Sequence, residues 1–257
     1  MGQDQIDEIF AQTLTGDYDD ESPWNSVRKL HHVGSRRVFD RAAAWCSSDD
    51  PLKRARGADV LAQLGAGPDH PERTFPDESF EIVSTLVQQE RDPLPLLSAV
   101  YALGHIGNPL AVPLVIDHRL HPSADVRKAV AFALGHFADD PRAVDTLLAL
   151  MRDVDVDVRD WATFGLGVQG DLDSAEIREA LYQRMTDSSR DVREESLVGL
   201  AKRQDRRALP ALVVELSQPE MSVRVIEAAE AFLSDTGQVA DRSPENLVAA
   251  LKERFSF

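Results

Sequence analysis

The sequence has little of what marks a secreted, membrane-bound or disulfide-stabilised protein. Its 257 residues include one cysteine, Cys46, which excludes an internal disulfide and a metal site built from several cysteines. No window contains the roughly 18 consecutive apolar residues that a membrane helix needs. The N-terminal stretch MGQDQIDEIF lacks the basic start and apolar run of a signal peptide. We therefore expect a globular protein of the reducing cytoplasm that does not associate with membranes.

Motifs that carry nucleophilic, phosphate or metal chemistry are also absent from the sequence. The chain contains no GxSxG nucleophile elbow, no P-loop, no GxGxxG fingerprint and no HExxH zinc motif. Cys46 lies in the apolar stretch AAAWCSS, where a thiol is usually buried and unreactive. The closely spaced histidines are His31 with His32 and His118 with His121, and a proline ends the helix that would carry the second pair. The sequence predicts no catalytic residue, no metal site and no cofactor.

Charge is unevenly distributed along the chain. Lysine and arginine number 28 against 44 aspartate and glutamate residues, which gives a formal net charge of −16. Such a field repels phosphate backbones and favours a basic partner, although excess acid can also serve solubility alone. Residues 1–25 carry seven acids and no lysine or arginine, whereas residues 26–56 carry eight bases and three acids. The basic segment either neutralises the acidic one before it or forms a nucleic-acid site over residues 28–56.

An internal repeat organises the chain. The segments HPSADVRKAVAFALGHF (121–137), DVDVDVRDWATFGLGVQ (153–169) and DSSRDVREESLVGLAKR (187–203) align without gaps. Their Val-Arg pairs, together with a fourth at 223–224, are spaced by 32, 34 and 31 residues. The upstream segments 92–107 and 50–65 fit the same frame. A period in the thirties indicates a stack of supersecondary units.

Each repeat is predicted to contain two helices, as the segment around Pro141 shows. Asp139 or Asp140 suits the N-cap of the first helix, with Pro141 at its first position. The second helix is expected to begin near Asp157 and to stop at Gly167, the glycine just past a helix end. Small and apolar residues form one stripe along these second helices and let neighbouring helices approach closely; in one repeat they are Val126, Ala129, Val130, Ala133 and Leu134.

These patterns predict an all-α protein, because no stretch shows the period-two alternation of a strand. We expect one right-handed α-solenoid of about six helical hairpins spanning residues 1–257. It would begin with an acidic N-terminal segment (1–21) that contains a loose helix over 4–14. N-terminal repeats (22–65), an insertion loop (66–76) and central repeats (77–235) would follow. A C-terminal capping region (236–257) with a helix over 243–254 would close the solenoid.

The repeat resembles the HEAT-repeat superfamily, and in particular the short bacterial HEAT-like repeats that also occur in phycobilisome lyases. The resemblance is carried by three Asp-Val-Arg starts, by Ala-Leu-Gly at 102–104 and 133–135, and by a proline in each first helix. It covers residues 90–235 strongly and 22–65 in part. It implies a fold and is nearly silent on function.

Arginines that recur once per repeat favour a structural role, since binding or catalytic groups rarely recur in this way. We expect each to pair with an aspartate of a neighbouring repeat and so to form a ladder. Its members would be Asp125, Arg127, Asp157, Arg159, Asp191, Arg193 and Arg224.

An aromatic residue stands three positions before the glycine in three repeats: Tyr101, Phe132 and Phe164. Stacking would align these rings on one ridge of the second helices, which line the concave face in HEAT-like proteins. Interfaces favour aromatic anchors with polar rims, but the rings could equally pack between helices as core. The candidate partner-binding residues are Tyr101, His105, Lys128, Phe132, His136, Asp160, Trp161, Phe164 and Glu194.

Our leading hypothesis from the sequence is a non-catalytic scaffold that binds a protein or peptide with a basic surface along the concave face. Carboxylates would steer its association; they are Asp155, Asp157, Asp160, Glu194 and Glu195. The runner-up is a bilin-lyase-like or chaperone-like protein that holds a small apolar ligand near Trp161, Phe132 and Phe164. HEAT-like DNA glycosylases need a basic groove that this chain's charge opposes, and HEAT-repeat diiron hydroxylases need His-Glu dipeptides, which are absent.

Overall fold

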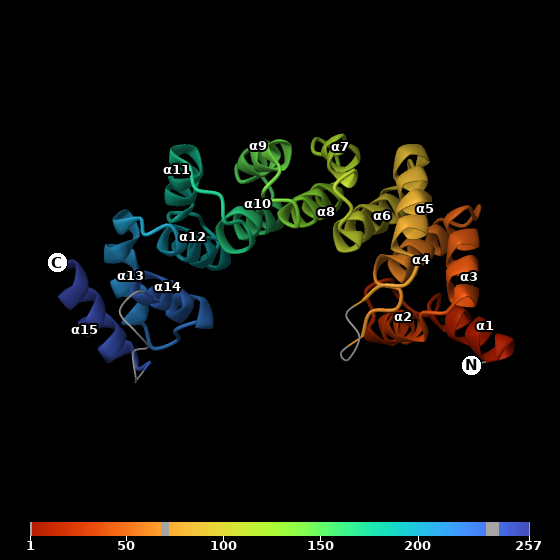
Figure 1. Ribbon diagram of the computed structural model, residues 1–257, viewed down its shortest axis with the longest axis horizontal. Coiled ribbons are helices and arrows are strands. Elements are labelled where there is room, and N and C mark those ends of the chain that lie inside the picture. Colours follow the sequence, from red (N-terminus) through yellow and green to blue (C-terminus); the bar gives the residue numbers. More distant parts are fainter. Residues whose placement is uncertain (1, 68–71, 235–241, 257) are drawn as a thin grey trace. The chain divides into compact units, whose positions relative to one another are not determined.

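The computed structural model describes residues 2–67, 72–234 and 242–256, and over these ranges the chain is helical with no β-strand. The chain divides into two compact units, residues 1–137 and 138–257 (Figure 1). The first unit contains α1 (Gln3–Gln12), α2 (Glu21–Val33), α3 (Arg36–Cys46), α4 (Pro51–Ala62), α5 (Pro76–Gln89), α6 (Pro93–Ile106), α7 (Ala111–Ile116) and α8 (Ala124–Gly135). The second contains α9 (Pro141–Leu150), α10 (Val156–Phe164), a π-helical turn (Gly165–Gln169), α11 (Ala175–Arg184), α12 (Arg190–Lys202), a 3-10 turn (Arg206–Ala208), α13 (Leu209–Leu216), α14 (Val223–Leu233) and α15 (Pro244–Phe255).

Both units are built from helical hairpins that pack through their second helices. In the first unit α4 packs on α6 and α6 on α8, while α3, α5 and α7 are the first helices of these hairpins. In the second unit α10 packs on α12 and α12 on α14, with α9, α11 and α13 as first helices and α15 against α13 and α14. Successive hairpins joined in this way confirm the expected α-solenoid class.

The apolar stripe expected along the second helices is confirmed by its burial. Val126, Ala129, Val130, Ala133 and Leu134 of α8 are all completely buried. The small side chains leave room for α6, which packs against the same side of α8. Burial of this stripe supplies the hydrophobic stabilisation that a single hairpin cannot obtain alone.

Helix starts follow the local signals in the sequence. Asp140 caps α9 by accepting a hydrogen bond from the Arg142 amide at 2.8 Å, and Pro141 takes the first helical position. The cap of α10 is Asp155, which accepts from the Asp157 amide at 3.0 Å. The second helix therefore begins at Val156, slightly before the expected start.

Two of the repeated glycines, Gly104 and Gly167, are contact points between helices, which corrects their expected role as helix ends, whereas Gly135 ends α8 as expected. Gly104 lies inside α6, and Gly167 lies in the π-helical turn that continues from α10. A Cβ on Gly104 would lie 2.7 Å from the Cα of Ala133, and one on Gly199 would lie 2.7 Å from the Cα of Gly167. These glycines are needed because the neighbouring backbone is too close for a side chain.

The acidic N-terminal segment is tied to the hairpins of the first unit. Its connection to α2 is anchored by Arg56, whose guanidinium donates to the main-chain oxygens of Thr13 at 2.9 Å and Tyr18 at 2.6 Å. Arg56 also pairs with the buried Asp59 at 3.2 Å. The Tyr18 hydroxyl donates to Asp59 at 2.9 Å and lies 2.7 Å from the Ser98 hydroxyl of α6. This network joins the segment to both α4 and α6.

The C-terminal closing helix expected over 243–254 is found as α15. Residues 68–71 of the expected insertion loop, residue 235 at the end of the central repeats, and residues 236–241 and 257 of the expected capping region lie outside the described residues. None of the helices in the described ranges is both long and apolar enough to cross a membrane.

Candidate interaction surface

In the first unit, aromatic side chains of α6 and α8 cluster on one side of the second helices. The ring centroids of Tyr101 and Phe132 lie 4.8 Å apart, and His105 lies 5.0 Å from Phe132. His136 completes the cluster at 4.9 Å from Phe132. The tyrosine, phenylalanine and His105 are half-buried and His136 is exposed, so the cluster is partly open to solvent.

The histidines add little positive charge to this cluster. Burial, followed by the charges of His136 and Arg73, lowers the pKa of His105 to about 4. His105 is therefore neutral at physiological pH, with its Nε2 3.4 Å from the amide nitrogen of Gln63. The nearby ammonium of Lys128 pairs with Asp125 at 3.1 Å. The surface of the first unit is consequently aromatic rather than cationic at this point.

In the second unit, four predicted residues lie on one side of α10. Asp157, Asp160, Trp161 and Phe164 follow the i, i+3, i+4, i+7 spacing of one helix face. Asp157 is exposed and the other three are half-buried. The Trp161 and Phe164 rings meet edge to face with centroids 5.7 Å apart. This side of α10 offers carboxylates beside aromatic rings.

Asp160 lies against a second carboxyl group, that of Glu195 on the packed helix α12. Glu195 is only 4% exposed. Oδ1 of Asp160 and Oε2 of Glu195 are both buried and accept no hydrogen bond from any other described residue, whereas a hydrogen bond between the two carboxyl groups contributes to the raised pKa of Glu195. Burial, followed by the charges of Asp191 and Asp157, raises the pKa of Asp160 to about 6. Burial, followed by the charge of Asp160, raises the pKa of Glu195 to about 8.

At neutral pH this pair therefore holds one proton, carried mainly by Glu195. Two ionised carboxylates that are buried side by side would repel each other. The shared proton neutralises one of them and removes that repulsion. Arg224 of α14 is a cationic neighbour of the pair: its guanidinium lies 3.5 Å from Glu195 Oε1 and 5.1 Å from the centre of the Phe164 ring. Arg224, expected in the ladder, thus lies at the carboxyl pair.

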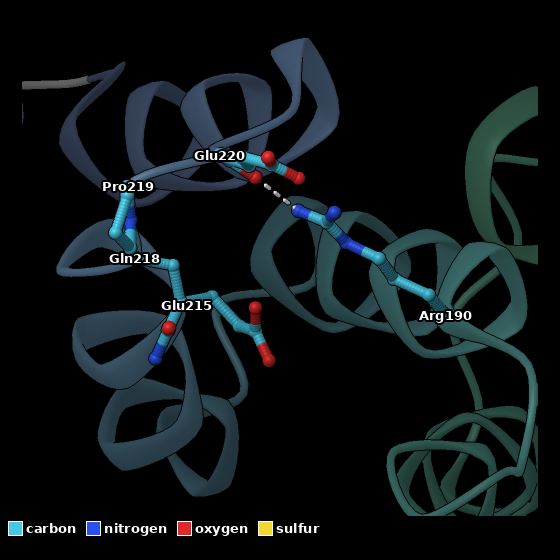
Figure 2. Close-up of a pocket in the computed structure, with 5 residues that line it drawn as sticks. All are labelled: Arg190, Glu215, Gln218, Pro219 and Glu220. Carbon is cyan, nitrogen blue, oxygen red and sulfur yellow. Dashed lines mark hydrogen bonds between the residues drawn. The ribbon is translucent and has the colours of Figure 1, made fainter.

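Glu194, expected to contact a partner, is held inside the second unit instead. It is 4% exposed and accepts hydrogen bonds from Arg190 Nε at 2.7 Å and from the Ser222 hydroxyl. Figure 2 shows Arg190 reaching the main-chain oxygen of Glu220 across a pocket of about 380 Å³. The lining residues of this pocket are Arg190, Glu215, Gln218, Pro219 and Glu220. Glu194 therefore connects the start of α12 to the start of α14.

Three of the four recurring arginines make the same contact with the turn before their own helix. Arg127 Nη1 donates to the main-chain oxygen of His121 at 2.9 Å, six residues earlier. Arg159 does the same to Asp153 at 3.0 Å, and Arg193 to Asp187 at 2.8 Å. Each also reaches the oxygen five residues earlier. In these three repeats a guanidinium thus holds the inter-helix turn against the second helix.

Arg159 pairs with an acid of the next hairpin, and the acid is not among those predicted. Arg159 binds Asp187 in bidentate fashion, at 2.8 and 3.0 Å. Asp187 precedes α12, whereas the predicted partners Asp125, Asp157 and Asp191 lie within first helical turns. The turn before α12 thus brings the Asp187 carboxylate to the Arg159 guanidinium of α10.

Four of the eight bases in the basic segment 28–56 pair with acids of their own unit. Arg54 pairs with Glu90 at 2.6 Å and with Asp92 at 2.7 Å. Arg36 pairs with Glu78 at 2.7 Å. Further pairs join Arg56 to Asp59 and Arg41 to Asp7. Much of the positive charge of this segment is therefore neutralised locally.

Sequence reasoning singled out most of the α10 side chains but gave Glu195 only a steering role. The sequence did contain a signal for its burial. In the aligned repeats, the position of Glu195 is occupied by Trp161 and Ala129, which stand 34 and 66 residues earlier. A carboxyl group at a position that is otherwise apolar predicts burial. Within the described ranges, no group of three or more His, Cys, Asp or Glu side chains is placed to hold a metal ion.

Hairpins stacked through their second helices place the protein among the α-solenoids. A family model described as HEAT repeats matches residues 81–167 and 147–233, together more than half of the chain. The chain belongs to the HEAT-repeat family.

Two kinds of relative match this chain. Protein YibA of Escherichia coli is 27% identical over 229 residues, which cover 87% of this chain and 79% of that protein. Its X-ray structure superposes with a TM-score of 0.70 at 24% identity, over 97% of this chain and 94% of that one, and so shows the same fold. An uncharacterized phycocyanin operon protein Z of Pseudanabaena tenuis is 28% identical over 142 residues, covering 54% of this chain and 67% of that protein.

Proposed function

We propose that the protein is a non-catalytic scaffold that binds a protein or peptide with a basic surface. The partner would lie on the face that the second helices of the hairpins form, called here the second-helix face. The observation that carries this proposal is the α10 side described above, where Asp157 and Asp160 flank the partly open rings of Trp161 and Phe164. Aromatic anchors next to charged groups are typical of protein recognition sites. HEAT repeats provide extended faces of this kind.

The electrostatics of the chain support a cationic partner. The net charge of −16 attracts basic surfaces over the Debye length, about 8 Å at physiological salt. In the second unit, the exposed acids Asp157 and Asp191 stand at the second position of α10 and α12. They add negative charge to the side that carries the aromatic rings.

The same features disfavour a nucleic acid as the partner. Phosphate binding depends on lysine and arginine side chains that are available to replace counterions. The basic segment spends Arg36, Arg41, Arg54 and Arg56 on ion pairs with acids of the first unit. A phosphate backbone would have to displace those acids against the overall charge.

The proposal is tested with a fluorescently labelled octa-arginine peptide, whose binding to the full chain is followed by anisotropy. We expect binding at 50 mM salt that weakens steadily to 300 mM, while an octa-glutamate peptide does not bind. Absence of octa-arginine binding, or binding that is indifferent to salt, would overturn the proposal.

A matched pair of variants locates the binding face. Asp191→Asn removes a charge at the second position of the second helix α12, and Glu176→Gln removes one at the second position of the first helix α11. Both side chains are exposed, so neither change disturbs the core. Asp191→Asn should weaken binding several-fold and Glu176→Gln should leave it unchanged. Equal effects would mean that net charge, and not this face, attracts the peptide.

A second candidate function is the binding of a small apolar pigment, favoured by the similarity to the phycocyanin operon protein Z. The site in this unit would be the pair of rings Trp161 and Phe164. Incubation with free bilin should then shift its absorbance and give fluorescence that Trp161→Ala abolishes. An unchanged bilin spectrum would discard this candidate.

A further inference from the structure

A pocket of about 540 Å³ lies in the first unit, where the end of α2, the turn after α4 and the stretch that leads into α5 meet. Its lining residues include His32, Gly34, Gly65, Glu72, Arg73 and Thr74. We propose that this pocket binds the oxyanion of a small molecule, a phosphate or a carboxylate group, and that the Arg73 guanidinium holds it. The site belongs to the first unit and is separate from the α10 side of the second unit that carries the proposed function.

The walls of the pocket are fixed by hydrogen bonds within the chain. The Gly65 amide donates to the main-chain oxygen of His31 at 2.8 Å. The Thr74 amide donates to the main-chain oxygen of Leu64 at 2.7 Å, and its hydroxyl donates to that of Gly34 at 2.9 Å. A Cβ on Gly34 would lie 2.8 Å from the Cα of Gly65, so a side chain would not fit between these two turns. Three segments far apart in sequence thus form the pocket before any ligand arrives.

Arg73 brings to this pocket a guanidinium that the chain does not neutralise. Its side chain is half-buried, no carboxylate of the described ranges pairs with it, and its buried Nε has no hydrogen-bond partner there. Burial lowers the pKa of Arg73. The adjacent Glu72 also lines the pocket, but it is exposed and forms no ion pair with Arg73. An oxyanion would supply the paired acceptors that a guanidinium fork binds most strongly.

The charges around the pocket are mostly opposite in sign to the net charge of the protein. Burial lowers the pKa of His31, and the positive charges of His32, Arg28 and Arg73 lower it further. Burial also lowers the pKa of His136, followed by the charge of Arg73. Salt screens charges beyond about 8 Å under physiological conditions. A ligand in the pocket therefore experiences these cations and Glu72 more strongly than the distant acids that produce the net charge of −16.

The size of the pocket and its few cations favour a small molecule over a polyanion. A volume of about 540 Å³ lies within the range of roughly 300–1,000 Å³ that is usual for small-molecule sites. A nucleic-acid backbone would need a row of available cations, and the net charge opposes it. Arg73, with the imidazole of His32 as a second donor on the same pocket, suits one phosphate or carboxylate group. The remaining volume is available to the organic part of the ligand.

The test is isothermal titration calorimetry of the full chain at constant ionic strength with three probes: inorganic phosphate, phenyl phosphate and glutarate. We expect saturable binding of at least one probe, one molecule per chain. Binding of the two phosphates would identify a phosphate ligand, and binding of glutarate alone a carboxylate ligand. Arg73→Gln should weaken this binding by about tenfold or more. No saturable binding of any probe, or binding that Arg73→Gln leaves unchanged, would overturn the proposal and leave octa-arginine binding to the second unit unaffected.

A second variant of the pocket should have the opposite effect. Glu72→Gln removes a carboxylate that repels the oxyanion, so it should strengthen binding several-fold. Arg152→Gln and Glu176→Gln make the same two charge changes at exposed positions of the second unit and should leave the affinity unchanged. If the distant variants act as strongly as those in the pocket, the net charge governs binding and the proposal fails.

Two readouts show that Arg73→Gln remains folded and acts at the expected place. Its thermal midpoint should match that of the unchanged protein, because no ion pair of the described residues is lost; a clear decrease would reveal a partner for Arg73 and contradict the proposal. In histidine titrations by NMR, the variant should raise the pKa of His136, since a positive charge that lowers it is gone. The probe that binds should raise the same pKa in the unchanged protein and not in Arg73→Gln. A His136 pKa that the bound probe does not move would place the ligand away from Arg73 and overturn the proposal.

Discussion

Removal of the Arg159 guanidinium tests how neighbouring hairpins of the second unit are joined. The side chain forms two hydrogen bonds to the Asp187 carboxylate and two to main-chain oxygens of its own turn. Asp187 is 9% exposed, so its charge depends on these donors. Arg159→Ala leaves Arg184 Nη1 at 3.0 Å, the Ser189 amide at 3.0 Å and the Ser188 hydroxyl at 3.4 Å as donors to Asp187.

The magnitude follows from the titration of Asp187. Burial by itself would raise its pKa, but hydrogen bonds from Arg159 and from the Ser189 amide hold it at about 2, against an ordinary 3.8. This difference corresponds to about 2.4 kcal/mol at 1.36 kcal/mol per pKa unit. In Arg159→Ala, Arg184 would retain part of this stabilisation of Asp187, but the two main-chain contacts of Arg159 would also be lost. We therefore expect a decrease of about 2–3 kcal/mol in the free energy of unfolding.

The chain offers a matched control in Arg193. This side chain makes the same two contacts with main-chain oxygens, those of Asp187 and Ser188, and no carboxylate within the described part of the chain pairs with it. Arg193→Ala should therefore cost only about 1 kcal/mol. The comparison separates the inter-hairpin ion pair from the repeated turn contact.

Urea denaturation followed by circular dichroism at pH 7, 5, 3 and 2 measures both losses. A carboxyl group whose folded pKa is depressed stabilises the protein above its unfolded pKa, near 4, and this contribution disappears as pH falls through the folded value near 2. The deficit of Arg159→Ala should thus be full at pH 7 and shrink toward that of Arg193→Ala at pH 2. Equal deficits at pH 7, or a deficit independent of pH, would refute the role given to the Arg159–Asp187 pair.

Three further outcomes follow from the packing of the first unit. Arg56→Met should lower the free energy of unfolding by about 3–5 kcal/mol in urea titrations, because Asp59 would be left buried without its cation; a second change, Asp59→Asn, should restore part of the loss. Gly104→Ala should destabilise the folded protein by about 1–3 kcal/mol in thermal unfolding, because the new Cβ would lie 2.7 Å from the Cα of Ala133. A variant that is more stable than the unchanged protein would show that α6 and α8 can move apart. The Cys46 thiol is buried and its pKa is raised to about 12, so iodoacetamide at pH 8 should modify it only in urea, and rapid reaction of the native protein would contradict this.

The features that sequence reasoning could predict are those set by local signals. Asp140 followed by Pro141 begins α9 because the carboxylate and the ring act on the backbone within a few residues. The 31–34-residue spacing of the Val-Arg pairs indicates stacked hairpins before any contact is known. The buried stripe of α8 follows from helical periodicity in the same way.

Features set by a neighbouring hairpin could not be predicted from one repeat. Gly167 has the sequence context of a helix end, but its place is decided by Gly199, whose backbone approaches it from α12. The acid that binds Arg159 is likewise decided by the path of the turn before α12, which brings Asp187 within 2.8 Å. Residues far apart in the chain determine both outcomes, and periodicity carries no information about them.

Glu195 shows how a repeat protein makes one unit different from the others. The repeat fixes the backbone position, and that position holds a completely buried alanine at 129 and a half-buried tryptophan at 161. A carboxyl group in this place loses hydration that a surface carboxylate would keep, and it lies beside Asp160, which makes its ionisation still less favourable. An apolar residue here would stabilise the stack more, so the carboxyl group conflicts with local packing. Such conflicts concentrate where a protein binds or reacts, and this one lies beside the aromatic rings that the proposed partner would contact.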